Sequence, residues 1–240
     1  MGAGRVMVAP TFMPGPSIGL VAGWSFPARV FEPLARHLSG REVLALDWSR
    51  FATDWLQPGP GDLHPPTRSP AVWVGWSLGG SLLLEAVRRG VIRPSRLVLL
   101  QTTPCFLARD ERDTPIGWPG VARADWQGLR RAAERSPWRA AMAFRRRFGL
   151  PLDPSPTPAS TSIAGLDWLA RLDLREALAD IDVPVDLWLA PDDPLVPVDW
   201  PGRIDLPDRV RVCRFERGGH AAWIEHAVPL AADIASRAGR

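Results

Sequence analysis

The residues with the clearest chemical potential form the pattern Gly75-Trp76-Ser77-Leu78-Gly79. An apolar, strand-like run at 71–74 precedes it and a helix-like run at 78–89 follows it, which is the setting of a nucleophilic serine. Such a serine sits on a strained turn with its hydroxyl exposed, and small flanking residues let strand and helix approach closely. The pattern predicts that Ser77 is a nucleophile for acyl-transfer chemistry. An ordinary glycine-rich turn is the alternative.

A serine nucleophile needs a base that takes its proton and a carboxylate that orients this base. In hydrolases with this turn, the acid and then the histidine follow the serine along the chain. Asp192 and Asp193 come directly after a predicted strand, and His220 follows a later strand and two glycines. The other histidines precede Ser77 or fall within a predicted helix. The order therefore predicts His220 as the base and leaves both aspartates open as the acid.

An oxyanion hole is the third requirement, because two N–H groups must face the charge that develops on the carbonyl oxygen. The residue after the nucleophile, Leu78, is expected to supply one backbone N–H. The loop after the predicted strand at 18–22 contains Trp24, which is expected to supply the second. The Trp24 ring would then form one wall of an acyl pocket. Plain core packing is the alternative role for this side chain.

Strand-like and helix-like runs alternate, which is typical of an α/β fold with a mostly parallel sheet and helices on both faces. Strands are predicted at 5–8, 18–22, 42–46, 71–74, 96–101, 185–190 and 209–215, and helices at 28–38, 78–89, 122–135, 137–148, 163–171 and 222–236. The alternation breaks between Pro104 and Asp182. We therefore expect one domain spanning residues 1–240, with a helical cap inserted at about 107–180 over the carboxyl edge of the sheet.

Composition excludes several classes of protein. All 29 basic residues are arginine, the chain has no lysine, tyrosine or asparagine, and its 26 acidic residues leave a net charge of only +3. The high isoelectric point thus reflects the lack of groups that titrate near pH 10, and does not indicate nucleic-acid binding. No apolar run approaches the roughly 20 residues of a membrane span, and no secretory signal is visible. We expect a cytoplasmic monomer that binds neither nucleic acid nor membrane and needs no metal or organic cofactor.

Several motifs, in order from about Ile18 to Pro229, resemble those of the pimeloyl-acyl-carrier-protein methyl ester esterases of biotin synthesis. They are Gly75-Trp76-Ser77-Leu78-Gly79-Gly80, Thr103-Pro104-Cys105-Phe106, Ala108-Arg109-Asp110, Trp118-Pro119-Gly120, Leu172-Asp173-Leu174-Arg175, Asp193-Pro194-Leu195-Val196-Pro197 and Gly219-His220-Ala221. The resemblance implies an α/β-hydrolase fold and a serine carboxylesterase with the triad Ser77, Asp193 and His220. It also implies Trp24 and Leu78 at the oxyanion hole.

Two segments depart from the family pattern. Ala22-Gly23 stands where the family usually has His-Gly, and Asp47-Trp48-Ser49-Arg50 replaces an Asp-x-Pro-Gly-x-Gly segment. Both departures bear on substrate identity more than on hydrolase chemistry. A general short-chain carboxylesterase, an acyltransferase and a non-catalytic carrier-binding module on the same fold are therefore the alternatives.

The predicted cap is amphipathic and rich in arginine. Its arginines are expected to dock an acidic acyl carrier protein and the phosphate of its phosphopantetheine, as the resemblance implies, with Arg130, Arg139, Arg146 and Arg147 as candidates. A solvated face is the alternative, because the chain has no other basic residue. Expected walls of the acyl pocket are Trp24, Trp76, Phe106 and Phe144.

Overall fold

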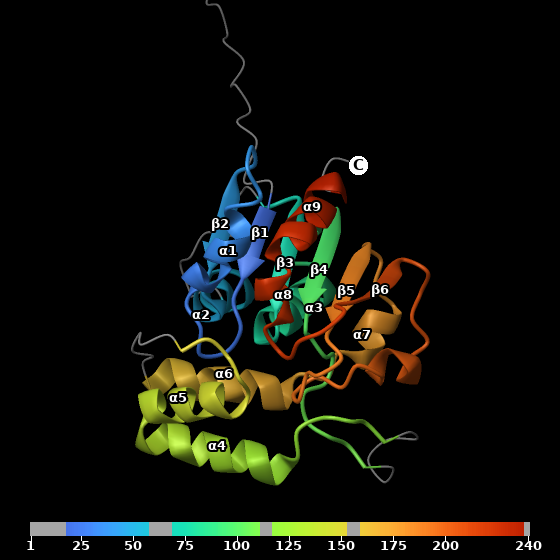
Figure 1. Cartoon of the computed structure of the whole chain (residues 1–240). Helices are drawn as coiled ribbons and strands as arrows, with labels where there is room; N and C mark the ends of the chain where they lie inside the picture. The colour runs from blue at the N-terminus through green and yellow to red at the C-terminus, as the bar shows by residue number, and fades with distance from the viewer. Residues whose placement is uncertain (1–17, 58–68, 111–116, 153–158, 238–240) are drawn as a thin grey trace, which may run out of the picture.

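A computed structural model describes residues 18–57, 69–110, 117–152 and 159–237. Its centre is a six-stranded, all-parallel sheet in the order β2-β1-β3-β4-β5-β6 (Figure 1). The strands are β1 (Ile18–Val21), β2 (Val43–Leu46), β3 (Val72–Trp76), β4 (Arg96–Leu100), β5 (Val185–Leu189) and β6 (Val210–Arg214). Each lies within one or two residues of its predicted range. The strand predicted at 5–8 falls outside the described residues.

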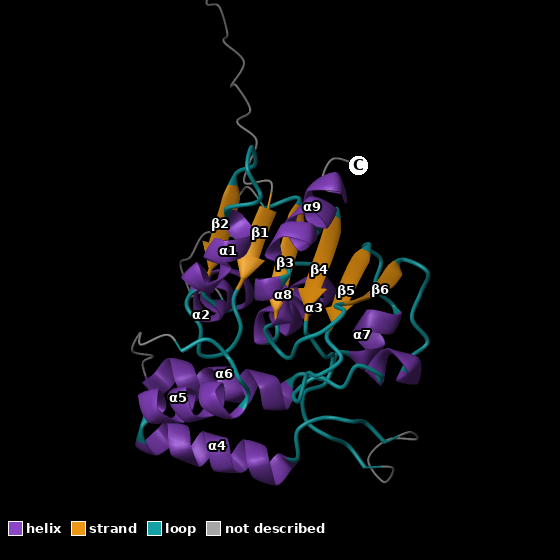
Figure 2. Cartoon of the chain, viewed as in Figure 1, coloured by secondary structure: helices purple, strands orange, loops and turns teal. Residues whose placement is uncertain are grey.

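Helices cover both faces of the sheet, which confirms the predicted fold class (Figure 2). Successive strand residues point to opposite faces, so Trp73 of β3 packs into one apolar cluster while Val72 and Val74 pack into the other. The Trp73 face is covered by α3 (Leu78–Arg88) and α7 (Arg175–Ala179), and the opposite face by α1 (Glu32–Ala35), α8 (Ala222–Glu225) and α9 (Ala227–Arg237). Burial on both faces explains the nearly continuous apolar character of these strands.

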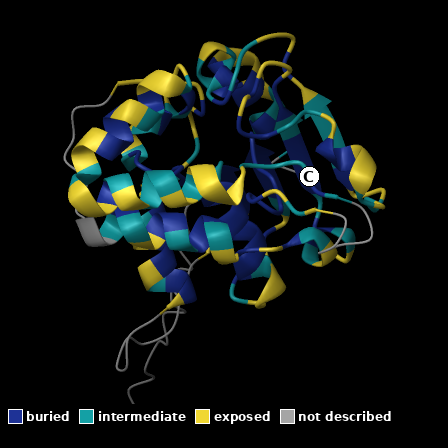
Figure 3. Ribbon diagram, turned by 90° about the horizontal axis from the view of Figure 1, so that it is seen from below, coloured by how far each residue is buried: buried dark blue, intermediate teal, exposed yellow. Residues whose placement is uncertain are grey.

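A separate layer of helices lies beyond the carboxyl ends of the strands (Figure 1). This helical layer consists of α4 (Arg123–Arg135), α5 (Pro137–Arg147) and α6 (Ala159–Arg171). It is tied together by the Trp126 indole, which donates to the Leu166 carbonyl oxygen at 2.9 Å, and by packing of the buried Ala133. Figure 3, seen from the side of this layer, shows exposed residues alternating with more buried ones along its helices, as expected for amphipathic helices.

Several helices differ from their predicted ranges. The helix predicted at 28–38 is a 3-10 turn, η1 (Ala28–Phe31), followed by the short α1. The helix predicted at 222–236 breaks at His226, because Pro229 has no N–H with which to continue an unbroken helical hydrogen-bond series. Four elements were not predicted: α2 (Trp48–Phe51), the π turn η2 (Ala52–Leu56), α7 and η3 (Trp200–Arg203). Among the described helices, none is both long enough and apolar enough to cross a membrane.

Candidate active site

Ser77 lies on a strained turn between β3 and α3. Its φ of 54° and ψ of −121° fall outside the regions that non-glycine residues normally adopt. The turn is held because the Ser77 N–H donates to the Leu100 carbonyl oxygen of β4 at 3.0 Å. Its close packing also needs glycine: a Cβ on Gly75 would lie 2.5 Å from the Gly80 Cα. The local sequence thus builds the nucleophile turn that its pattern predicts.

His220 lies between Ser77 and Asp193. Its Nε2 is 2.8 Å from the Ser77 Oγ, and its Nδ1 is 2.8 Å from the Asp193 Oδ2. With a proton on Nδ1, the ring donates to the carboxylate and accepts the serine hydroxyl proton on Nε2. The structure therefore brings together all three predicted triad residues, from loops that follow β3, β5 and β6.

The geometry distinguishes the two candidate acids. Asp193 is buried, and its Oδ1 accepts hydrogen bonds from the Leu195 and Val196 N–H groups at 2.8 and 3.0 Å. Its other oxygen is thereby aimed at His220. Asp192 is exposed to solvent. Only Asp193 is placed to orient the histidine.

The loop after β1 packs directly against the nucleophile. A Cβ on Gly23 would lie 3.3 Å from the Ser77 Cβ, so a larger residue would crowd the serine. Trp24 comes next, and within the described part of the chain neither its backbone N–H nor that of Leu78 donates a hydrogen bond. Two N–H groups from segments that meet at Ser77 are thus available to a ligand oxygen, as an oxyanion hole requires.

A mainly apolar cavity of about 590 Å³ lies between α4, α5 and the turn that carries Asp193. Its walls include Phe106, Trp126, Leu129, Phe144, Phe148 and Leu195. Two predicted wall residues, Phe106 and Phe144, therefore line it. The Trp24 ring is not part of the lining but meets Phe144 edge-on, with ring centroids 5.0 Å apart.

Trp76 has a different position from the one predicted. Its side chain is 1% exposed and does not line this cavity. Its indole N–H instead donates to the His220 carbonyl oxygen at 2.7 Å, and its ring packs against Trp223. Trp76 thus supports the loop that carries the histidine.

The four candidate docking arginines separate into two groups. Arg130 is engaged within the helical layer, where it pairs with Asp167 of α6 at 2.8 Å and with Glu134 of its own helix. Arg139, Arg146 and Arg147 are exposed on α5. Arg145 of the same helix is instead fully buried and reaches the loop after β1. Sequence reasoning did not single out Arg145, although its position three residues after Met142 and four after Ala141, both buried, places it on the inward face of α5.

Within the described ranges, no group of three or more histidine, cysteine or acidic side chains could hold a metal ion. Cys105 and Cys213 are free thiols, and burial raises the pKa of both.

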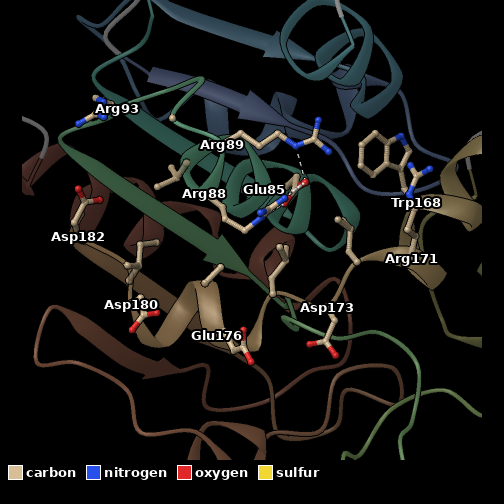
Figure 4. Close-up of a pocket in the computed structure, with 16 residues that line it drawn as sticks. Glu85, Arg88, Arg89, Arg93, Trp168, Arg171, Asp173, Glu176, Asp180 and Asp182 are labelled. Carbon is tan, nitrogen blue, oxygen red and sulfur yellow. Dashed lines mark hydrogen bonds and ion pairs between the residues drawn. The ribbon is translucent and has the colours of Figure 1, made fainter. Parts of the chain in front are cut away.

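A second cavity, of about 720 Å³, lies away from the triad, between the carboxyl half of α3, the end of α6 and α7 (Figure 4). Arginines gather on one side of it and carboxylates on another. Glu85, whose side chain is 3% exposed, accepts hydrogen bonds there from the Arg88 and Arg89 Nε atoms, each at 2.6 Å. Burial alone would raise the pKa of the Glu85 carboxyl, but the two arginines outweigh it and lower this pKa below its usual value.

This lowered pKa predicts a pH-dependent contribution of Glu85 to stability. A group whose pKa is lower in the folded state stabilises the protein above its unfolded pKa, about 4.3 for glutamate, and the contribution disappears as pH falls through the folded value. We expect the free energy of unfolding to fall more steeply with acidification in the wild type than in Glu85→Gln. Urea denaturation at a series of pH values checks this, and parallel curves for the two proteins would contradict it.

Comparisons with known proteins agree with the fold. Residues 12–233 match the alpha/beta hydrolase family. Relatives called pimeloyl-acyl-carrier-protein methyl ester esterase include one from Xylella fastidiosa, 29% identical over 92% of this chain and 94% of its own. Another, from Aromatoleum aromaticum, is 30% identical over 88% of this chain and 93% of its own. The resemblance described from the motifs is therefore confirmed.

Solved structures share the architecture. An esterase from Exiguobacterium antarcticum matches with a TM-score of 0.70 at 14% identity, over 95% of this chain and 94% of that one. A bromoperoxidase from Bacillus anthracis matches with a TM-score of 0.71 at 16% identity, over 94% and 92%. At such identities the likeness concerns the fold alone. Because a match over most of the chain agrees with the parallel sheet and the nucleophile turn, the chain belongs to the alpha/beta hydrolase family.

Proposed function

We propose that this protein is a serine esterase that hydrolyses the methyl ester of a pimeloyl chain attached to acyl carrier protein. The observation that carries the chemistry is the hydrogen-bonded series of Ser77, His220 and Asp193, with 2.8 Å at each step. The names of relatives that match along most of the chain support the substrate. A cytoplasmic location and a monomeric state stay predictions from the sequence.

The reaction uses the triad in two steps. In the first, the Ser77 Oγ attacks the ester carbonyl carbon while its proton passes to the His220 Nε2. Asp193 stabilises the imidazolium that forms, and the backbone N–H groups of Trp24 and Leu78 stabilise the oxyanion. His220 then protonates the departing methanol. In the second step water attacks the acyl-enzyme while its proton passes to His220, and His220 returns this proton to the Ser77 Oγ as the free acid leaves.

The helical layer serves in this proposal as the cap over the site. The apolar cavity between α4, α5 and the Asp193 turn has room for a medium acyl chain, and Phe144 links it to Trp24 of the oxyanion loop. The methylene groups of a pimeloyl chain would bury apolar surface against Phe106, Phe144 and Phe148. The carrier end of the chain would then point outward across the cap.

The experiment that tests this function measures methanol release from two methyl esters: pimeloyl methyl ester attached to acyl carrier protein, and dimethyl pimelate free in solution. We expect a much higher kcat/KM for the carrier-bound ester. Equal values for the two would indicate a general carboxylesterase. Absence of hydrolysis of either ester would support the binding-module alternative.

Charge reversal on the exposed face of α5 is expected to separate carrier docking from chemistry. Arg139, Arg146 and Arg147 are the remaining docking candidates, since the Arg130 guanidinium already pairs with Asp167 and Glu134. Arg146→Glu should lower kcat/KM for the carrier-bound ester by about tenfold, because electrostatic steering and guanidinium contacts to phosphate are lost. Turnover of p-nitrophenyl butyrate, which has no carrier, should stay unchanged.

The matched control for this prediction is Arg93→Glu. Arg93 is also exposed, but it precedes β4 and so lies at the amino edge of the sheet, opposite the helical layer. We expect this variant to act on both esters like the wild type. An equal loss in both charge reversals would mean that overall net charge, and not a docking face on α5, sets the rate.

A further inference from the structure

Arg145 is buried on a helix whose other nearby arginines are exposed. It is 1% exposed, whereas Arg146 and Arg147 face solvent. Removing a guanidinium group from water is unfavourable unless specific contacts compensate for it. The contacts of Arg145 therefore indicate what this side chain does.

Two of those contacts are made with the loop that follows β1. The Arg145 Nε donates a hydrogen bond to the Ser25 Oγ at 3.3 Å. The centre of its guanidinium lies 4.2 Å from the centroid of the Phe26 ring, a distance typical of a cation–π interaction. One side chain from α5 thus holds the two residues that directly follow Trp24.

Ser25 occupies a backbone conformation that needs support. The Phe26 N–H donates to the Gly23 carbonyl oxygen at 3.2 Å, which closes a four-residue turn with Trp24 and Ser25 at its centre. The φ of Ser25 is 68°, a left-handed value that favours glycine at the third position of such a turn. A hydrogen bond to the buried Ser25 hydroxyl offsets the cost of this conformation.

The Trp24 side chain is held by the same layer. Its indole N–H donates to the Ser162 carbonyl oxygen of α6 at 2.9 Å, and its ring meets Phe144 of α5 edge-on. These contacts hold the indole, whereas Arg145 contacts the two residues that follow Trp24 in the turn.

We propose that Arg145 is a positioning residue for the oxyanion hole: it holds the turn of Gly23, Trp24, Ser25 and Phe26 so that the Trp24 N–H faces the oxyanion. This inference rests on the proposed serine-esterase chemistry at Ser77. It gives the helical layer a second role, because the packing of α5 against the loop then supports the catalytic geometry as well as the acyl pocket.

The test uses Arg145→Met, which keeps a long apolar side chain, and Ser25→Ala, which removes only the hydroxyl. Both are assayed with p-nitrophenyl butyrate, so that carrier docking plays no part. Inhibition by butylboronic acid is measured in parallel. Boron accepts a lone pair from the Ser77 Oγ, whose proton passes to His220, and the tetrahedral adduct places an oxygen in the oxyanion hole. Arg131→Met, an exposed arginine of α4, is the control.

We expect Arg145→Met to lower kcat by about tenfold with KM changed less than about twofold. Complete loss of an oxyanion donor lowers kcat by about 10²–10³-fold, and displacement of the donor should cause part of that loss. The inhibition constant of the boronic acid should rise by a similar factor. The double variant with Ser25→Ala should be no slower than Arg145→Met, because both changes break one interaction. Arg131→Met should match the wild type.

Unchanged kcat and unchanged boronate inhibition in folded Arg145→Met would overturn the proposal. A fall in kcat of the double variant equal to the product of the falls in the two single variants would also overturn it. If Arg145→Met does not fold, Ser25→Ala decides: a lowered kcat with unchanged KM supports the role, and an unchanged kcat overturns it. Failure of the wild type to hydrolyse both p-nitrophenyl butyrate and the carrier-bound methyl ester would remove the proposed function and this inference with it. Wild-type turnover beside an unaffected Arg145→Met would overturn the role of Arg145 alone.

Discussion

Replacement of Ser77 by alanine should abolish ester hydrolysis and leave the folded protein intact. The change removes only the Oγ that lies 2.8 Å from the His220 Nε2, and with it the atom that attacks the ester. Alanine also keeps the Cβ, so the strain at a φ of 54° is nearly the same in both proteins. We expect kcat to fall by about 10⁴-fold or more, with the residual rate due to the oxyanion hole and binding.

Two measurements check this expectation. Thermal unfolding should give midpoints within a few degrees for Ser77→Ala and the wild type, and a fluorophosphonate probe should label the wild type alone. Ser81→Ala is the matched control: this serine lies one turn further along α3, and its hydroxyl donates to the Thr103 carbonyl oxygen at 3.3 Å. It should lose about 1 kcal/mol of stability but keep both labelling and turnover. Turnover by Ser77→Ala near the wild-type rate would contradict the assignment of the nucleophile.

The nucleophile turn could be predicted because its signal is local. A strand, five residues and a helix specify the conformation of Ser77, and the order of the chain then points to His220. The choice between Asp192 and Asp193 had no local signal beyond the resemblance. It depends on which carboxylate turns inward, and the N–H groups of Leu195 and Val196 settle that direction only in the folded turn.

The contacts between the helical layer and the loop after β1 had no such signal, since they join residues far apart in the chain. Arg145 and Ser25 are separated by 120 residues, and nothing near either one shows that they meet. The segment that departs from the family pattern after β2 also makes a contact with a residue far away in the chain. Trp48 in that segment is buried, and its ring would lie 2.8 Å from a Cβ on Gly165 of α6. Both departures thus lie close to the loop after β1, because Ala22 directly precedes Gly23 and Trp48 packs against α6, whose Ser162 carbonyl oxygen accepts the Trp24 indole N–H.

Gly79→Ala should be the most damaging small substitution in the nucleophile turn. A Cβ at this position would lie 2.1 Å from the Val21 carbonyl oxygen and 2.7 Å from that of Ala22. These are backbone atoms at the carboxyl end of β1 and just after it, so no side chain can rotate away, and α3 would have to shift from β1. The strain should exceed the higher helix propensity of alanine, worth about 1 kcal/mol, and cost about 3 kcal/mol overall.

The same shift would also displace the nucleophile turn and the loop after β1, because Gly79 lies two residues after Ser77 and Ala22 is directly followed by Gly23 and Trp24. We therefore expect Gly79→Ala to lose activity even at temperatures where it stays folded. Gly128→Ala on α4 is the control, since nothing lies within 4 Å of a Cβ there, and helix propensity alone should stabilise it by up to about 1 kcal/mol. Urea denaturation of the two variants should thus give shifts of opposite sign. Equal stability of Gly79→Ala and the wild type, with full activity, would mean that the nucleophile does not depend on this close contact between helix and strand.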